Sequence, residues 1–274
     1  MTDGEAPRPA GGAGGAGEEG GPAGDGGPRM SFLEHLDELR RRLLFCFVAA
    51  LAGLVACWFV ADRILAFLLD PVAHAMGPLA VIRPAEAFMA KVKASFVGGI
   101  FVALPIFFWQ LWAFVSPGLY PRERRWVVPV MVVGTVLFLA GAAFCYWIAM
   151  PAAVDFLASQ GEQFEFHVTV DYAFSFAAKL LLGLGVVFEM PLVVFALARL
   201  GLVSARFLWR KLDIAIFVCF VVAAVITPTP DVMTMTLFAA PMIVLYLVSI
   251  VVAALADPFR RERKGRRRDP EGTR

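Results

Sequence analysis

The stretch that decides the fold is residues 31–43, SFLEHLDELRRRL, which runs directly into a long apolar segment. Its apolar residues recur at helical spacing: Phe32, Leu36, Leu39 and Leu43. They form one apolar stripe on a helix whose remaining surface carries acids and arginines, a pattern typical of an amphipathic helix at a membrane surface. Glu38 and Arg42 stand four residues apart, a spacing that favours a local ion pair.

The composition indicates an integral membrane protein. Of the 274 residues, 59% are hydrophobic, whereas soluble chains are about 45 to 50% apolar even with glycine included. The four cysteines all lie inside apolar runs, so we expect them to pack as small apolar residues and not to form disulfides. The net charge of +2 says little, because in a membrane protein the position of each charge matters more than the sum.

The chain divides into a membrane domain between two tails. Residues 1–30 are rich in Gly and lack an apolar run, so we expect a disordered cytoplasmic tail, and residues 257–274 form a basic cytoplasmic tail. Within 31–256 we predict an all-α polytopic fold with six transmembrane helices. Their expected bounds are 43–61, 94–115, 126–150, 172–198, 212–228 and 232–256.

Basic clusters predict the topology. With six crossings, the clusters at 40–42, 122–125, 199–211 and 260–268 fall on one side of the membrane, which the positive-inside rule makes cytoplasmic. Both termini are then cytoplasmic. The segment 212–228 is short for a crossing, and a re-entrant hairpin built from it and the last segment would satisfy the same charge bias.

The fourth predicted span contains two ionisable residues, Lys179 and Glu189. Charges inside the bilayer are costly and are therefore the first functional candidates in a membrane protein. The long stem of Lys179 can reach the interface, whereas Glu189 is deep and short, and Pro191 loosens the backbone beside it. Glu189 is the stronger candidate.

A second pair of candidates is Glu38 and Glu123, two carboxylates on separate elements of the cytoplasmic face. Each could accept a bidentate guanidinium group. Their spacing alone favours a simpler interpretation, in which each pairs with the arginines next to it in the sequence.

Several motifs together resemble the TatC family, the multi-spanning receptor subunit of the twin-arginine protein translocase. The first is HLDELRRRL at 35–43. Three others follow in the family's order: 112–125 (WAFVSPGLYPRERR), 188–191 (FEMP) and 227–231 (TPTPD). Each motif is modest alone, but their order and their spread along the chain make the set specific.

The resemblance implies a signal-peptide site. In the family, the positions matching Glu38 and Glu123 receive the paired arginines of the signal peptide, and Arg40 and Arg42 belong to the same surface. Four further positions match residues that the family uses in roles we cannot derive from the sequence: Pro71, Phe114, Asp171 and Asp231.

The resemblance also implies a partner site inside the membrane. Glu189 matches a glutamate exposed on the concave membrane face, near the docking place of single-span TatA-type or TatB-type subunits. Some relatives carry Gln or Glu in the last span where this chain has Met235 and Leu247, and Thr234 and Thr236 could substitute for them.

These implications add up to a six-span, glove-like bundle in the prokaryotic cytoplasmic membrane. It would bind signal peptides of folded cargo, assemble into homo- or hetero-oligomers in the lipid bilayer, and use the proton-motive force. We expect no catalysis, cofactor, metal or nucleic acid. The alternative is a proton-coupled transporter of small solutes using Glu189, which inverted repeats would favour. An intramembrane enzyme is less favoured, because the histidines have no zinc spacing.

Overall fold

The computed structural model describes residues 32–115, 127–160, 167–227 and 231–266, and these are almost entirely helical. Along the chain the elements are α1 (Phe32–Trp58), α2 (Ala61–Met76), α3 (Pro84–Val115), α4 (Val127–Phe144), the π-helical turn η3 (Cys145–Ala149), α5 (Met150–Gln160), α6 (Val170–Phe188), α7 (Met190–Leu200), α8 (Ala205–Arg210), α9 (Leu212–Ile226) and α10 (Val232–Arg266). Within the described ranges, the β contact between Ala80 and Thr169 is an isolated parallel bridge.

Five helical segments of the described chain are long and apolar enough to cross a membrane. They are Leu36–Trp58, Pro84–Phe114, Val128–Gln160, Val170–Leu200 and Val232–Ala256. A sixth apolar helix, α9, has 15 residues. At 1.5 Å per residue it is about 22 Å long, less than the ~30 Å of a hydrocarbon core. The predicted all-α, multi-pass membrane fold is confirmed.

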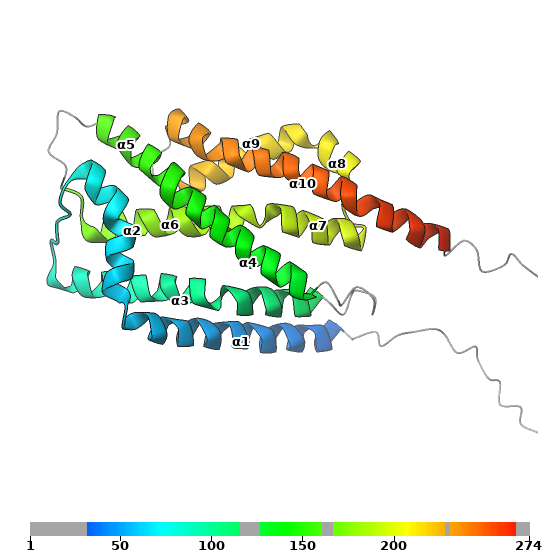
Figure 1. Ribbon diagram of the computed structural model, residues 1–274, viewed down its shortest axis with the longest axis horizontal. Coiled ribbons are helices and arrows are strands. Elements are labelled where there is room, and N and C mark those ends of the chain that lie inside the picture. The colour runs from blue at the N-terminus through cyan, green and yellow to red at the C-terminus, as the bar shows by residue number, and fades with distance from the viewer. Residues whose placement is uncertain (1–31, 116–126, 161–166, 228–230, 267–274) are drawn as a thin grey trace, which may run out of the picture.

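The helices form a bundle with two distinct ends (Figure 1). α1 and α3 lie side by side along one edge, α4 crosses the middle of the bundle diagonally, and α10 with α8 and α9 lies along the opposite edge. α1 begins and α10 ends at the same end, which we call the basic end because it carries Arg40, Arg41 and Arg42. We call the other end, where α2 lies and α6 begins, the α2 end.

The main core is centred on α6, which buries side chains against neighbours on several sides. Leu180 and Leu184 of α6 are fully buried together with Met150 of α5 and with Phe238 and Met242 of α10. A smaller apolar cluster joins α7 and α8 to the second half of α10. By contrast α1 buries little, and its large apolar side chains face outward, as expected for a helix that contacts lipid.

α1 and α3 cross at a pair of glycines. A Cβ atom on Gly99 would lie 2.5 Å from the backbone nitrogen of Leu54, and one on Gly53 would lie 2.6 Å from the carbonyl oxygen of Gly99. Small residues at such a crossing let two membrane helices approach closely. This close contact fixes how the basic end of α1 is aligned with the end of α3.

Several helices extend beyond the predicted spans. α2 lies between the first two predicted spans, α3 begins ten residues before position 94, and α3 continues through Pro105. The third helical run continues past position 150 to Gln160, although Pro151 lacks an N–H group. The π-helical turn just before Pro151, in which the N–H of Met150 bonds to the Cys145 carbonyl, is a widened turn of the kind that accommodates such a break in the hydrogen-bond ladder.

Candidate functional site

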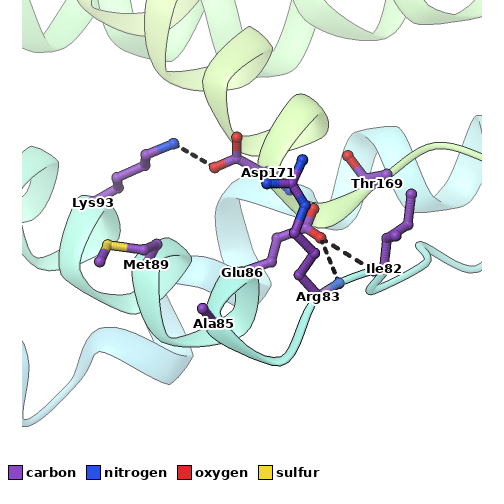
Figure 2. A pocket seen from close by; sticks show the side chains of 8 residues that line it. All are labelled: Ile82, Arg83, Ala85, Glu86, Met89, Lys93, Thr169 and Asp171. Carbon is purple, nitrogen blue, oxygen red and sulfur yellow. Dashed lines mark hydrogen bonds and ion pairs between the residues drawn. The ribbon is translucent and has the colours of Figure 1, made fainter.

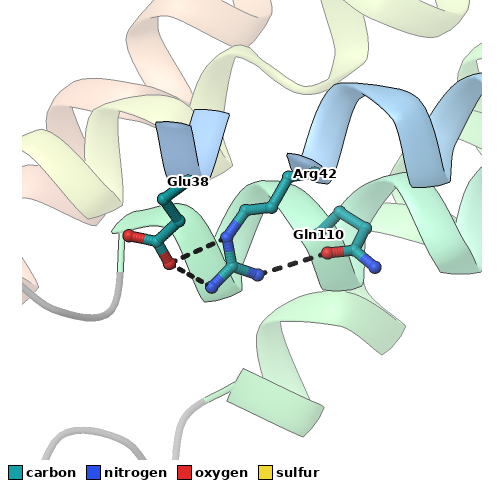
Figure 3. A network of polar contacts seen from close by, with 3 residues as sticks. All are labelled: Glu38, Arg42 and Gln110. Carbon is teal, nitrogen blue, oxygen red and sulfur yellow. Dashed lines mark hydrogen bonds and ion pairs between the residues drawn. The ribbon is translucent and has the colours of Figure 1, made fainter. Parts of the chain in front are cut away.

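At the basic end, a carboxylate, a guanidinium and an amide form a chain of hydrogen bonds (Figure 3). Arg42 donates from Nε to Glu38 Oε1 at 3.0 Å, and its Nη2 makes a second, shorter contact with the same oxygen. Its Nη1 donates to Gln110 Oε1 at 3.2 Å. The guanidinium therefore bridges one carboxylate of α1 and one amide of α3.

Helix geometry explains how these three groups meet. Glu38 and Arg42 lie one turn apart on α1, so their side chains share a face. Gln110 is 68 residues from Arg42 in the sequence, and the close crossing of α1 and α3 brings it alongside. The side chains of Arg42 and Glu38 are only 24% and 18% exposed, so their ion pair is shielded from water more than an ordinary surface pair.

For the other residues at this end that the resemblance implied, the structure gives the exposure of two and does not describe the third. Arg40 is exposed on α1, and Phe114 is half-buried near the end of α3. Glu123 lies outside the described residues. Gln110 was not among the sequence candidates, and its only signal was that it is a lone polar residue in an apolar span.

Glu189 lies at the break between α6 and α7. Its N–H donates to the Val186 carbonyl at 3.1 Å and its carbonyl accepts from Val193 at 3.0 Å, so the backbone turns there without losing these bonds. The side chain is 8% exposed, and neither carboxyl oxygen has a hydrogen-bond partner within the described part of the chain. The resemblance implied an exposed glutamate, but this one lies inside the isolated bundle, because α4 packs closely on the turn that precedes it through Gly141.

Thr234 lies in the first turn of α10 and is 2% exposed. Its N–H donates to Asp231 Oδ1 at 2.6 Å, so Asp231 caps the start of the helix. The hydroxyl group of Thr234 has no hydrogen-bond partner among the described residues. Asp231 therefore has a clear local role, whereas the buried hydroxyl of Thr234 is a polar group still in need of an acceptor or donor.

At the α2 end, Glu86 connects the loop before α3 to the start of α6 (Figure 2). Its Oε1 accepts the backbone N–H of Asp171 at 3.1 Å, and its Oε2 accepts the N–H groups of Ile82 and Arg83 at 3.1 and 3.4 Å. The Asp171 carboxylate forms an ion pair with Lys93 of α3. These groups line a cavity of about 350 Å³.

Pro71 lies inside α2 beside a second hollow at the α2 end. The hollow is also lined by Phe67, Tyr146 and Trp147, and the Phe67 and Tyr146 rings stack with centroids 4.2 Å apart. In the described ranges, no three His, Cys, Asp or Glu side chains come together as metal ligands.

Fold and polar sites together define a class: a multi-pass helical membrane protein with a polar network at each end of the bundle and a buried carboxylate at one helix break. Comparison with known proteins identifies the family. Residues 34–241 match the family model of the Sec-independent protein translocase protein (TatC). The chain belongs to the TatC family.

Relatives and solved structures agree with this assignment. The TatC proteins of Koribacter versatilis (strain Ellin345) and Carboxydothermus hydrogenoformans (strain ATCC BAA-161 / DSM 6008 / Z-2901) are 45% identical over 241 residues and 38% identical over 238 residues. These matches cover 86% of this chain in both cases, and 89% and 98% of the two relatives. A crystal structure of the twin-arginine translocase receptor TatC matches with a TM-score of 0.74 at 33% identity, covering 82% of this chain and all of that one.

The family decides between the functional alternatives. TatC proteins are receptor components of a protein translocase and work in it with other Tat subunits, and they are not enzymes. The predicted family and the predicted role in protein translocation are confirmed. The alternative of a small-solute transporter finds no support in these matches.

Proposed function

We propose that Glu38 and Glu123 receive the paired arginines of a twin-arginine signal peptide, on a surface that also contains Arg40 and Arg42. The observation that carries this proposal is that Glu38 already holds a guanidinium group, since Arg42 donates to it from two nitrogens. A carboxylate placed to accept this fork is placed to accept the same fork from another chain.

The chemistry also accounts for a preference for arginine. A guanidinium is planar and presents several N–H groups in fixed directions, whereas the ammonium of lysine is a compact point charge. Two carboxylates on separate elements can each take one guanidinium of a neighbouring pair. A Lys-Lys peptide keeps the charge but loses the forked bonds, so it binds more weakly.

The test is to measure binding of a synthetic signal peptide and of its Lys-Lys version to the full chain in lipid nanodiscs. We expect Glu38→Ala with Glu123→Ala to reduce the preference for the Arg-Arg peptide by about tenfold or more, the range of one to two charge-assisted hydrogen bonds. The matched control is Asp37→Ala, because Asp37 is an exposed acid next to Glu38 on the same helix. An unchanged preference in the double variant would refute the role of these two residues.

We infer that Glu189 and Thr234 form contacts with single-span subunits of the TatA or TatB type. The support is that both residues are buried and carry polar atoms without a partner in the described part of the chain. Membrane helices are held together in part by such polar groups, and a partner helix with a hydroxyl or amide side chain could supply the missing bonds. Crosslinking from both positions to co-expressed partner subunits tests this inference.

We also propose that the chain resides in the prokaryotic cytoplasmic membrane with both termini inside. The support is that α1 begins and α10 ends at the same, arginine-bearing end of the bundle. Arginines favour the cytoplasmic side of a membrane. Reporter domains fused to either terminus should therefore be active only when the reporter works in the cytoplasm.

Among the remaining family-matched positions, we propose that Asp171 and Asp231 keep the ends of helices in place. Asp171 does so through Lys93 and Glu86, and Asp231 through the first turn of α10. For Pro71 and Phe114 we propose a packing role, since both are half-buried.

A further inference from the structure

The Glu38 carboxylate is already engaged in the free chain. Arg42 occupies its Oε1 with two N–H donors, and its other oxygen, Oε2, is buried. A forked bond from an incoming guanidinium needs both oxygens of a carboxylate, or one oxygen approached from the direction that Arg42 fills. An external arginine can therefore make this bond only after Arg42 has moved.

We propose that Arg42 is an internal competitor for Glu38, held in place by Gln110, and that a signal peptide binds by displacing it. This inference rests on the proposed function of Glu38. It adds a residue that sets the affinity for every guest, Arg42, and a positioning residue, Gln110, which acts through Arg42 and does not contact the peptide.

Gln110 is what makes the competitor effective. A single ion pair one turn apart on a helix is by itself too weak to hold off a strongly bound peptide. The bond from Arg42 Nη1 to Gln110 Oε1, at 3.2 Å, attaches the guanidinium to a second helix. The restrained guanidinium loses less conformational freedom on pairing with Glu38, which strengthens its hold.

Competition has a defined thermodynamic consequence. If Arg42 must leave before any guest can bind, it lowers the affinity of every guest by the same factor, the cost of displacing Arg42. The ratio of Arg-Arg to Lys-Lys affinities stays the same. Both affinities are lowered together. At a given peptide concentration the weaker Lys-Lys peptide then no longer occupies the site, while the Arg-Arg peptide still binds.

The experiment measures dissociation constants of the Arg-Arg and Lys-Lys peptides for the full chain in nanodiscs. We expect Arg42→Gln to tighten binding of both peptides by about threefold to tenfold, with their ratio unchanged. Gln110→Leu should give a smaller parallel gain, because Arg42 is then held by Glu38 alone. The double variant should match Arg42→Gln, since Gln110 acts only through Arg42.

Arg41→Gln is the matched control, because Arg41 is exposed on the same helix and its substitution removes the same charge. It should leave both dissociation constants unchanged or lower them only slightly, because it removes one exposed positive charge near a cationic peptide. The melting temperature of each variant identifies any that is misfolded. Gln110→Leu leaves the Glu38–Arg42 pair intact, so it tests the inference even if Arg42→Gln does not fold.

Unchanged or weaker binding of the Arg-Arg peptide by folded Gln110→Leu and Arg42→Gln overturns the inference. A changed Arg-Arg to Lys-Lys ratio overturns it as well, because Arg42 would then contact the peptide directly. Failure of the proposed function has a different result: Glu38→Ala would bind both peptides like the unsubstituted chain. Loss of binding in Glu38→Ala without any gain in Arg42→Gln contradicts the competitor alone.

Discussion

At the scale of single residues, the acidic side chains Glu38 and Glu189 lie in opposite environments. Glu38 has a guanidinium partner at the basic end of the bundle, whereas Glu189 is buried without a hydrogen-bond partner among the described residues. A buried polar group without a partner costs free energy in the folded chain, about 1 to 3 kcal/mol. Such a cost is understandable where the group serves binding.

This contrast leads to a prediction for Glu189→Leu. We expect the free energy of unfolding of this variant in detergent to stay the same or to rise by up to about 1 kcal/mol, because the unpaired carboxyl group is removed. Assembly with single-span partners and protein export should fall sharply. Glu189→Gln is the control, since it keeps a polar group of the same size. Full export by Glu189→Leu would contradict the role in partner contacts.

A second prediction concerns Glu86, which accepts three backbone N–H groups from two separate segments. Glu86→Ala leaves the N–H of Asp171 without this acceptor and loosens the loop at 80–83. We expect faster hydrogen exchange at Ile82, Arg83 and Asp171 and little change at the basic end. Asp155→Asn, which alters an exposed acid near the same end, should leave these exchange rates as they are. Equal rates in Glu86→Ala and the unsubstituted chain would show that the clamp is not needed.

The sequence pointed to residues that stand out from their neighbours in the chain, and it missed residues whose partners are distant in the sequence. Glu38 and Glu189 could be found because each stands out locally, one in a charged helix and one in an apolar run. Gln110 and Glu86 could not, because their partners lie 68 and 85 residues away. Only the packing of α1 on α3, and of α6 beside the loop before α3, brings these groups together.

At the scale of helices, α1 and α3 approach closely where Gly53 faces Gly99. We predict that Gly99→Ala destabilises the chain by about 1 to 3 kcal/mol, the usual cost of overpacking, because its Cβ would meet rigid backbone. Gly183→Ala is the control, since its Cβ would meet only the side chain of Ile226, at 3.1 Å. Thermal unfolding in detergent measures both.

Because the crossing also aligns Gln110 with Arg42, Gly99→Ala should weaken the hydrogen-bond chain at the basic end as well. Its peptide affinity should then move in the same direction as that of Gln110→Leu. Equal unfolding temperatures for Gly99→Ala and Gly183→Ala would mean that α1 and α3 can move apart to accommodate the added methyl group without a loss of stability.

Apolar runs were a good guide to the presence of helices and a poor guide to their ends. The run 94–115 is found as part of α3, but the helix begins at Pro84 because its first turns are held by Glu86 and by pairs such as Lys91 with Asp62. These contacts join distant parts of the chain and leave no mark in local hydropathy. Prolines do not mark the helix ends either, since the helices continue through Pro105 and Pro151.

At the scale of the whole molecule, the bundle separates two kinds of polar chemistry. The basic end carries a guanidinium held by a carboxylate and an amide, and the α2 end carries a network that fixes a loop to the start of α6. The two are joined by apolar helices, of which five are long enough to cross a membrane. This separation is compatible with a receptor that binds its ligand at the basic end, while the network at the α2 end keeps the helices in position.

A double-mutant cycle across the two chains shows whether Glu38 binds an arginine of the signal peptide. Binding constants would be measured for the full chain and for Glu38→Gln, each with the Arg-Arg peptide and with peptides in which one arginine is replaced by glutamine. We expect a coupling energy of about 1.5 to 3 kcal/mol between Glu38 and one of the two arginines, and almost none in the same cycle with Asp37→Asn. Additive effects of Glu38→Gln with both arginine replacements would contradict the claim.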